Sequence, residues 1–416
     1  MPVSAQSFRG AARLAFDCVG GLTSVVERMH ETIARHPLPW EDRAHEPTGA
    51  HGATAALVYQ AVRGVNGVVR QGVDSSLQAL TGSAGATPQE SATESAVVCA
   101  LNGICGDHLE ASENPLAIRM GFRTPEQPVE LSAGGVRQAF PQATPHLVVL
   151  VHGLCLSEGS WQGRDAPDIG ARLRAAGAGT PVYLRYNTGR HISTNGRELA
   201  DRLGRLVEAW PVPVESLTLI GHSMGGLVIR SACWVADQES QPWRQRVRRV
   251  VCLGTPHHGA PLEKLGHLVT AAMLATVYAG PLALGRRRSA GIKDLRFGNL
   301  LDEDWQGHDP DRLHPDSRRV VPLLEGVEYY FIAATVGRHE RALSGHVLGD
   351  LLVRLGSATG SHAEVLRRVR VRPENCRVFP GLHHLDLLDH PAVHDQLMAW
   401  LCPVQGLLSD PGSAEQ

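Results

Sequence analysis

The chain has 416 residues, of which 43% are hydrophobic and 20% are charged, a composition that supports a large buried core and excludes an intrinsically disordered chain. Its 40 basic and 42 acidic residues leave a formal net charge of -2, and no block of Lys and Arg has the density of a nucleic-acid-binding surface. We therefore expect two folded domains, or one decorated domain, and no nucleic-acid partner.

The eight Cys are far apart and lie mostly in apolar runs, which favours reduced, buried thiols over a disulfide framework. Near the N-terminus, Arg9, Arg13 and Asp17 interrupt the apolar residues, so no secretory leader is predicted there. Both features favour a cytoplasmic location.

Residues 1–113 show three helical patterns, with apolar residues three and four apart from Phe8 to Ile33, from Val58 to Leu80 and from Val97 to His108. We expect a helical N-terminal extension over this range, whose apolar stripes pack on one another and on the next domain. Peripheral contact with a lipid surface is the alternative.

From residue 114 onward the pattern changes to short apolar strands that alternate with helical segments. A hairpin is expected over 118–131, and a helix is expected to open at Asn195, with Glu198 three residues later. The strand candidates are Leu147 to Val151, Pro181 to Tyr186, Ser216 to Ile220, Val247 to Leu253, Glu328 to Thr335 and Cys376 to Phe379. This alternation predicts an α/β domain over 114–402, with a mostly parallel sheet and reactive groups at the carboxyl ends of its strands, followed by a flexible tail over 403–416.

A serine follows one of these strands in a sharp turn. The sequence Gly221-His222-Ser223-Met224-Gly225 stands between the strand at 216–220 and an apolar helix, and Gly on both sides of the Ser leaves room for a strained turn that exposes its hydroxyl. The amide of Met224 would then face a developing negative charge at the helix N-terminus. This pattern is typical of a nucleophilic serine, although the five-residue motif alone is weak.

The strand at 147–151 runs into His152-Gly153-Leu154. Gly153 would let this loop approach a substrate carbonyl, and the amide of Leu154 would be the second donor to an oxyanion. We also expect His152, Gly153, His222 and His257 to contact the substrate.

A reactive serine needs an imidazole base and a carboxylate that orients it, and in this topology the acid and then the histidine follow later strands. The last strand leads to two candidate bases, His383 and His384. Asp350, which follows Gly349, and Glu340 are the candidate acids, because Asp386 and Asp389 are too close to His384 in sequence to orient it easily.

These motifs together resemble the α/β-hydrolase superfamily, and within it the bacterial lipases and esterases related to GPI-inositol-deacylase-like proteins. The segments that carry the resemblance are 149–154, 221–226, 253–259 and 384–388. The resemblance covers about 145–402 and implies that Ser223 is the nucleophile, Asp350 the acid and His384 the base. In one place the chain departs from the family pattern, since relatives usually read Gly-Asp-Gly-Leu-Val-Pro where this chain has Leu351 after Asp350 and Arg354 in the place of Pro.

The connection over 260–327 is far longer than is usual between a strand and the next element. Its uncharged stretch from Leu268 to Gly285 favours a lid or a wall for an acyl chain, or else a helical decoration of the sheet.

The sequence therefore predicts a serine hydrolase that cleaves a small-molecule or lipid acyl ester through an acyl-enzyme, without a metal or an organic cofactor. The alternatives are an acyltransferase, a thioesterase or amidase that uses the same three residues, and a non-catalytic scaffold that binds a lipid or polymer surface. The scaffold is favoured only if Asp350 does not reach His384.

Overall fold

A computed structural model describes residues 7–17, 66–67, 69–71, 92–163, 168–260, 288–307, 316–337 and 349–402. Most of the first two predicted N-terminal helices lies outside these ranges. The same holds for the Leu268 to Gly285 segment of the predicted lid, for Glu340 and for the tail at 403–416.

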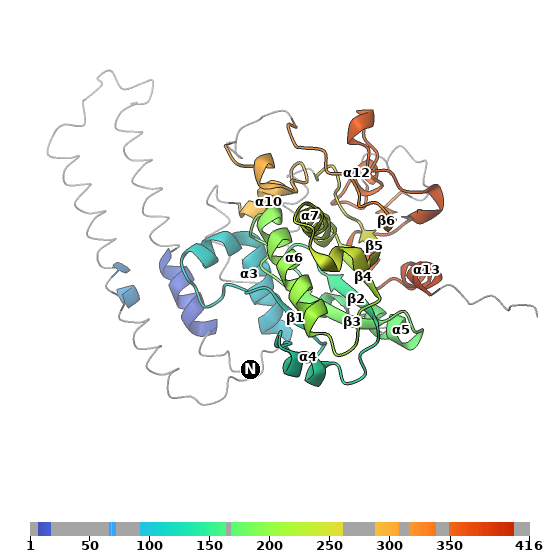
Figure 1. Ribbon diagram of the computed structural model, residues 1–416. Coiled ribbons are helices and arrows are strands. Elements are labelled where there is room, and N and C mark those ends of the chain that lie inside the picture. Colours follow the sequence, from blue (N-terminus) through green and yellow to red (C-terminus); the bar gives the residue numbers. More distant parts are fainter. Residues whose placement is uncertain are drawn as a thin grey trace, which may run out of the picture.

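Seven strands form one sheet in the order β1-β3-β2-β4-β5-β6-β7 (Figure 1). The strands are β1 (Gly121–Arg123), β2 (His146–Val151), β3 (Thr180–Arg185), β4 (Ser216–His222), β5 (Val247–Leu253), β6 (Glu328–Thr335) and β7 (Cys376–Pro380). All neighbours pair in parallel except β1, which is antiparallel to β3. The predicted mostly parallel sheet and its six strand candidates are confirmed.

The predicted hairpin at 118–131 is only partly formed: across its turn, the amide of Thr124 donates to the carbonyl of Gln127 and the amide of Val129 donates to the carbonyl of Phe122. Its first arm forms β1, but this strand pairs with β3, and its second arm contributes a single bridge between Arg123 and Pro128. A Pro has no N–H to extend a ladder, and Phe122, which is fully buried, gains more from a place in the large sheet than an isolated two-stranded hairpin offers.

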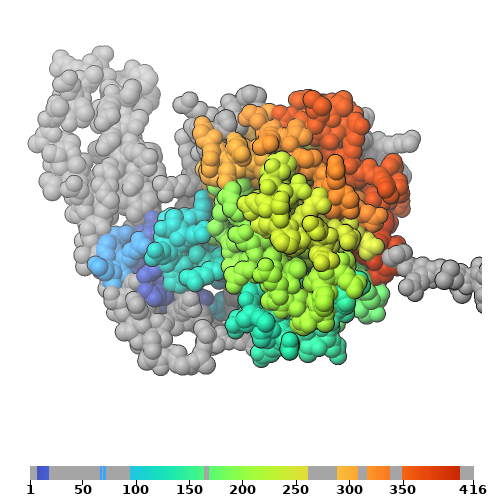
Figure 2. Space-filling view, in the orientation of Figure 1, coloured from blue at the N-terminus to red at the C-terminus, as the bar shows by residue number. Residues whose placement is uncertain are grey.

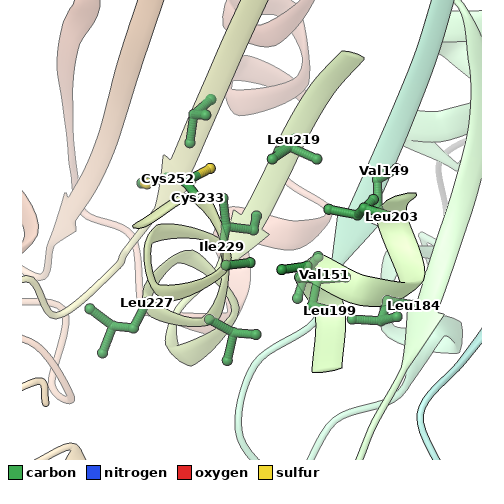
Figure 3. Close-up of a cluster of buried hydrophobic side chains, with 14 of the residues drawn as sticks. Val149, Val151, Leu184, Leu199, Leu203, Leu219, Leu227, Ile229, Cys233 and Cys252 are labelled. Atoms are coloured by element: carbon green, nitrogen blue, oxygen red, sulfur yellow. The ribbon is translucent and has the colours of Figure 1, made fainter. Parts of the chain in front are cut away.

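Helices cover both faces of the sheet (Figure 1). Along β2 the side chains of Leu147, Val149 and Val151 face one apolar cluster, while Val148 and Leu150 face the other, as the two-residue repeat of a strand requires. The first cluster includes residues of α4 (Ala133–Ala139), α6 (Ile192–Ala209) and α7 (Met224–Gln238), and Figure 3 shows part of it. The second includes residues of α5 (Ile169–Ala175) and α13 (Pro391–Leu401).

Helix α6 begins at Ile192, three residues before the predicted start at Asn195. The carboxylate of Asp294 accepts hydrogen bonds from the amide of Ile192, at 2.9 Å, and lies 3.0 Å from Nδ1 of His191. The helix N-terminus is therefore satisfied by a residue distant in the sequence, while Asn195 lies inside the helix and donates from its side chain to the carbonyl of Asn187.

The third predicted N-terminal helix is α3 (Ala92–Ala111), and residues 7–17 are also helical. Leu14 joins an apolar cluster with residues of α3. On its other side α3 lies against the domain that follows, because Asn187 donates to the carbonyl of Gly106 at 2.9 Å and Ser289 to that of Gly103 at 2.7 Å. The domain boundary at 113 stays a prediction.

Short helices complete the described chain. They are η1 (Glu158–Trp161), η2 (Pro242–Arg246), α10 (Ala290–Asp294), η3 (Asp302–Asp304), α12 (Leu355–Ala358), η4 (Val365–Arg367), η5 (Pro373–Asn375) and η6 (Leu385–Leu388). No helix in the described ranges has the length and apolar character needed to cross a membrane. The cysteines within those ranges carry free thiols, as predicted, but only Cys99, Cys105, Cys233 and Cys252 among them are buried.

Candidate active site

Ser223 stands alone between β4, which ends at His222, and α7, which begins at Met224. Its backbone has φ 54° and ψ -122°, a conformation that costs free energy for a residue other than Gly. The two flanking glycines are required sterically: a Cβ on Gly221 would lie 2.5 Å from the amide nitrogen of Gly226, and one on Gly225 would lie 2.3 Å from the carbonyl oxygen of Val151. The predicted sharp turn is confirmed.

The loop after β2 runs beside this serine. A Cβ added to Gly153 would lie 3.0 Å from Cβ of Ser223, so the loop passes close to the serine, and its approach to a substrate carbonyl stays a prediction. The Tyr186 hydroxyl donates to the carbonyl of His152 at 2.8 Å, and the amide of Cys155 donates to Oγ1 of Thr188 at 3.2 Å. The two bonds hold the loop on either side of Leu154, the residue expected to supply an oxyanion donor.

The other expected donor, the amide of Met224, belongs to the first residue of α7, where a helix leaves its amides without intrahelical partners. Both Leu154 and Met224 are buried. Two amides at adjacent strand ends, flanking a serine, form an arrangement able to stabilise a negative charge on a bound carbonyl oxygen.

His384 and Asp350 form a buried pair. Nδ1 of His384 lies 2.6 Å from Oδ2 of Asp350, and the side chains are 4% and 0% exposed. The other carboxylate oxygen, Oδ1, accepts from the amides of Leu352 at 3.0 Å and Val353 at 2.7 Å. Because both oxygens accept hydrogen bonds, the carboxylate is held in one orientation against the imidazole.

The imidazole of His384 lies beside the serine turn. Nε2 of His222 is 3.2 Å from the carbonyl oxygen of His384, and the two rings are 4.8 Å apart. A Cβ on Gly254 would lie 2.9 Å from Cε1 of His384, while the carbonyl of the preceding Leu253 accepts from the amide of Ser223 at 2.8 Å. Leu253, at the end of β5, thus contacts the serine backbone, and the next residue, Gly254, lies against the imidazole of His384. Within the described residues, no hydrogen bond joins the hydroxyl of Ser223 to His384, a contact that often forms only when substrate binds.

His383 and Glu340 are the rival candidates for the base and the acid. The side chain of His383 is exposed, and its amide donates to the carboxylate of Asp386 at 2.7 Å, so Asp386 stabilises the loop that carries the two histidines. Glu340 lies outside the described residues.

The remaining expected substrate contacts are three buried histidines, His152, His222 and His257, each at most 2% exposed. His152 stacks on Tyr186 at 4.6 Å and its Nδ1 is 2.9 Å from the carbonyl oxygen of Gly153. Burial lowers the pKa of His152 to about 4 and holds the pKa of His222 and His257 well below the usual range. They are therefore neutral at pH 7, and their contact with substrate stays a prediction.

The sequence did not assign roles to Tyr186 and Thr188, which hold the loop that carries Leu154. Tyr186 directly follows β3 and Thr188 comes two residues later, at the sheet edge where Ser223 lies, and this position is the feature by which they could have been found. No cluster of His, Cys, Asp and Glu able to hold a metal ion is present in the part of the chain that the structure describes.

Part of the chain is similar to known proteins in sequence and in structure. Residues 146–276 match the sequence model of the PGAP1-like alpha/beta domain family, and no curated protein matches the chain. Similar solved structures include a lipase of Bacillus licheniformis, BlEst2, with 19% identity, a TM-score of 0.40 and coverage of 68% of this chain and 98% of the lipase. Phospholipase PlaB from Legionella pneumophila, solved with thio-NAD, has 16% identity, a TM-score of 0.38 and coverage of 62% and 57%. Naproxen esterase from Bacillus subtilis has 15% identity, a TM-score of 0.34 and coverage of 61% of this chain and 82% of the esterase.

The family match covers β2 to β5 and includes the serine turn. It agrees with the resemblance that the motifs indicated: residues 146–276 are similar to the PGAP1-like alpha/beta domain family, and the described strands among them belong to a mostly parallel sheet covered by helices on both faces.

Proposed function

We propose that the protein is a serine hydrolase that cleaves carboxylic esters through an acyl-enzyme. The observation that carries this proposal is the buried pair of His384 and Asp350, at 2.6 Å, beside a serine in a strained turn. A serine hydroxyl is unreactive at its own pKa, and an imidazole held by a carboxylate supplies the base that it lacks. The condition for a non-catalytic scaffold, an Asp350 that fails to reach His384, is not met.

In the first half of the reaction, the hydroxyl oxygen of Ser223 attacks the ester carbonyl while Nε2 of His384 takes the hydroxyl proton. The carbonyl oxygen becomes an oxyanion, which the amides of Leu154 and Met224 stabilise. Collapse of this intermediate breaks the bond to the leaving alcohol, and His384 returns the proton to that oxygen, so that an acyl group remains on Ser223.

In the second half, a water molecule gives its proton to His384 and attacks the acyl carbonyl. The same two amides stabilise the second oxyanion, and its collapse releases the carboxylic acid and restores the serine hydroxyl. Asp350 orients the ring of His384 and stabilises its imidazolium. Removal of one oxyanion donor from such a site typically costs about 3 kcal/mol of transition-state stabilisation.

For the substrate we propose a lipidic or medium-chain acyl ester. The uncharged Leu268 to Gly285 segment supports this choice by composition alone, and several structurally similar proteins are lipases or esterases by name.

Labelling with a fluorophosphonate and turnover of p-nitrophenyl esters of increasing acyl length test the proposal. We expect the parent protein to be labelled, Ser223→Ala to be unlabelled, and His384→Ala to lose most of its turnover. His383→Ala is the matched control, since it changes the adjacent, exposed imidazole. Labelling that survives in Ser223→Ala, or turnover that depends on His383 instead of His384, would contradict the assignment.

A further inference from the structure

A surface cavity of about 310 Å³ lies between the loop after β5, the segment that precedes β6 and the residues around η4. None of its lining residues is Ser223, Asp350 or His384. Figure 2 shows the orange and red parts of the chain, which contribute two of its walls, next to each other on the surface. Six arginines line this cavity: Arg230, Arg318, Arg319, Arg367, Arg368 and Arg370.

Arg230, on α7, is only 5% exposed. Its NH2 group donates to the carbonyl of Val321 at 2.8 Å and its NH1 group lies 3.3 Å from Nδ1 of His257. Its Nε has no hydrogen-bond partner. Within the described residues no carboxylate pairs with this guanidinium, and a buried cation without a counter-charge is costly.

His257 adds a second unsatisfied donor. Because Arg230 donates to its Nδ1, the neutral ring carries its proton on Nε2. That atom is buried and has no partner. The two side chains that carry these buried N–H donors both line one cavity, and unsatisfied donors beside a cavity are suited to an acceptor that comes from outside the chain.

The other arginines fall into two groups. Arg318 and Arg367 share the carboxylate of Asp316, at 2.9 Å and 3.5 Å, and Arg367 also pairs with Glu364 at 3.1 Å, so two carboxylates neutralise these two arginines. In the second group, Arg319 stacks over Trp234, Arg368 donates to backbone carbonyls, and Arg370 is exposed.

The acidic residue in the wall does not balance this charge. The carboxylate of Asp304 is occupied by three backbone amides, those of Leu300, Leu301 and Arg319, at 2.9 to 3.0 Å. The cavity therefore has an excess of positive charge together with unused hydrogen-bond donors.

We propose that this cavity binds the phosphate group of a phosphate monoester, with Arg230 and His257 at its buried end and Arg319 and Arg370 at its rim. Arginine forks suit phosphate oxygens better than other cationic groups do. The inference goes beyond the proposed ester hydrolysis, since Ser223, Asp350 and His384 do not line the cavity and only His257 is shared with the expected substrate contacts. The phosphate could belong to a dissolved metabolite or to the headgroup of a membrane lipid, and the experiment below separates these sources.

Calorimetric titration of the full chain with glycerol 3-phosphate, with uncharged glycerol as the ligand control, tests the site. Arg370→Ala is the main variant because the residue is exposed and its loss should not disturb folding. Arg377→Ala, an exposed arginine on β7 outside the cavity, removes the same charge elsewhere. Arg230→Met tests the buried end, with circular dichroism to verify its fold.

We expect glycerol 3-phosphate to bind, glycerol not to bind, and Arg370→Ala to weaken affinity about tenfold. Arg377→Ala should bind glycerol 3-phosphate as the parent does. The parent, Arg370→Ala and Arg377→Ala should hydrolyse a neutral ester at equal rates. Equal affinity in Arg370→Ala and the parent, or equal losses in both arginine variants, would overturn the proposal independently of the hydrolase assignment.

Flotation with phosphatidylcholine vesicles, with and without phosphatidic acid, distinguishes the two sources. Phosphatidic acid-dependent binding that is lost in Arg370→Ala assigns the site to a lipid headgroup. Binding of dissolved glycerol 3-phosphate without vesicle binding assigns it to a soluble phosphate ester. If neither ligand binds the parent protein, no phosphate site exists.

Discussion

Leu351 adopts a backbone conformation that normally belongs to glycine. Its φ is 79° and its side chain is 45% exposed, at the position where the related sequences usually have Gly. A left-handed conformation costs an L-residue about 1–2 kcal/mol, whereas the greater backbone entropy of Gly in the unfolded chain costs about 0.5–1 kcal/mol. Leu351 thus preserves the turn, although it stands in place of Gly, the residue that adopts this conformation most easily.

Leu351→Gly should therefore raise the free energy of unfolding by up to about 1 kcal/mol. Urea denaturation followed by circular dichroism measures this change. Leu366→Gly is the control, because Leu366 is 85% exposed and has no positive φ, and we expect it to lower stability. If Leu351→Gly destabilises as much as the control does, the conformation of Leu351 is not strained.

Asp350→Asn should lower kcat by about 10⁴, the loss typical of this exchange in a serine triad. In the parent protein, Oδ1 of Asp350 accepts hydrogen bonds from two backbone amides. The Asn side chain must therefore direct its oxygen to these amides and turn its NH2 group toward His384. Nδ1 of His384 must then accept, which puts the ring proton on Nε2 and removes the base from Ser223.

Ester turnover at saturating substrate measures this effect, and fluorophosphonate labelling should slow in parallel. Asp386→Asn is the control, since Asp386 accepts from the amide of His383 in the same loop and does not pair with the His384 ring. A loss of similar size in both variants would mean that loop structure, and not the tautomer of His384, determines the rate.

Helix α3 packs against the loop that carries the expected oxyanion donor. A Cβ on Gly103 would lie 2.2 Å from Sγ of Cys155 and 3.0 Å from its backbone nitrogen and Cα. Cys155 has φ 61° and directly follows Leu154. A side chain on this face of α3 would therefore displace the loop or the helix.

Gly103→Ala should lower the free energy of unfolding by about 1–3 kcal/mol and also lower kcat, because the loop beside Ser223 must move. The same exchange at Gly134 in α4, where an added Cβ meets nothing within 4 Å, should stabilise the protein by about 0.4–1 kcal/mol. The double variant Gly103→Ala with Cys155→Ala should recover part of the loss. Full activity in Gly103→Ala would show that α3 does not position this loop.

The helix starts show where reading the sequence succeeds and where it fails. Helix α7 was predictable because the turn chemistry of Gly221, Ser223 and Gly225 is local. The start of α6 was not, because its capping carboxylate comes from Asp294, about a hundred residues away. The same limit applies to Tyr186, whose hydroxyl holds the carbonyl of His152 from a different strand.

For the whole molecule, alternation of apolar strands with helical segments was sufficient to predict a parallel sheet, since strands buried on both faces read as continuous apolar runs. It did not place the short β1, because Phe122 could pair locally or with β3, and only the larger burial in the sheet decides between them. Likewise, the chain order of acid and base pointed to Asp350 and His384, but their 2.6 Å contact depends on how the tertiary fold brings together two loops 34 residues apart.

The buried imidazoles of His152, His222 and His257 make the free energy of unfolding depend on pH. Burial lowers their folded-state pKa, to about 4 for His152 and well below the usual range for the other two, whereas an unfolded histidine titrates near 6.5. As the pH falls below that value the unfolded chain takes up protons that the folded protein excludes. The stability is therefore present above about pH 6.5 and is lost as the pH decreases toward the folded-state values.

We expect the free energy of unfolding to decrease between pH 7 and pH 5, with a slope that approaches about 1.4 kcal/mol per pH unit for each imidazole once the unfolded form is protonated. Urea denaturation across this window measures the slope. His152→Phe keeps a ring to stack on Tyr186 but cannot titrate. The slope of its unfolding free energy against pH should therefore be smaller by the contribution of one imidazole. Exposed His383 offers the matched control, because His383→Phe removes an imidazole that is not buried and should leave the slope unchanged. A parent protein equally stable at pH 5 and pH 7 would show that these imidazoles accept protons without unfolding.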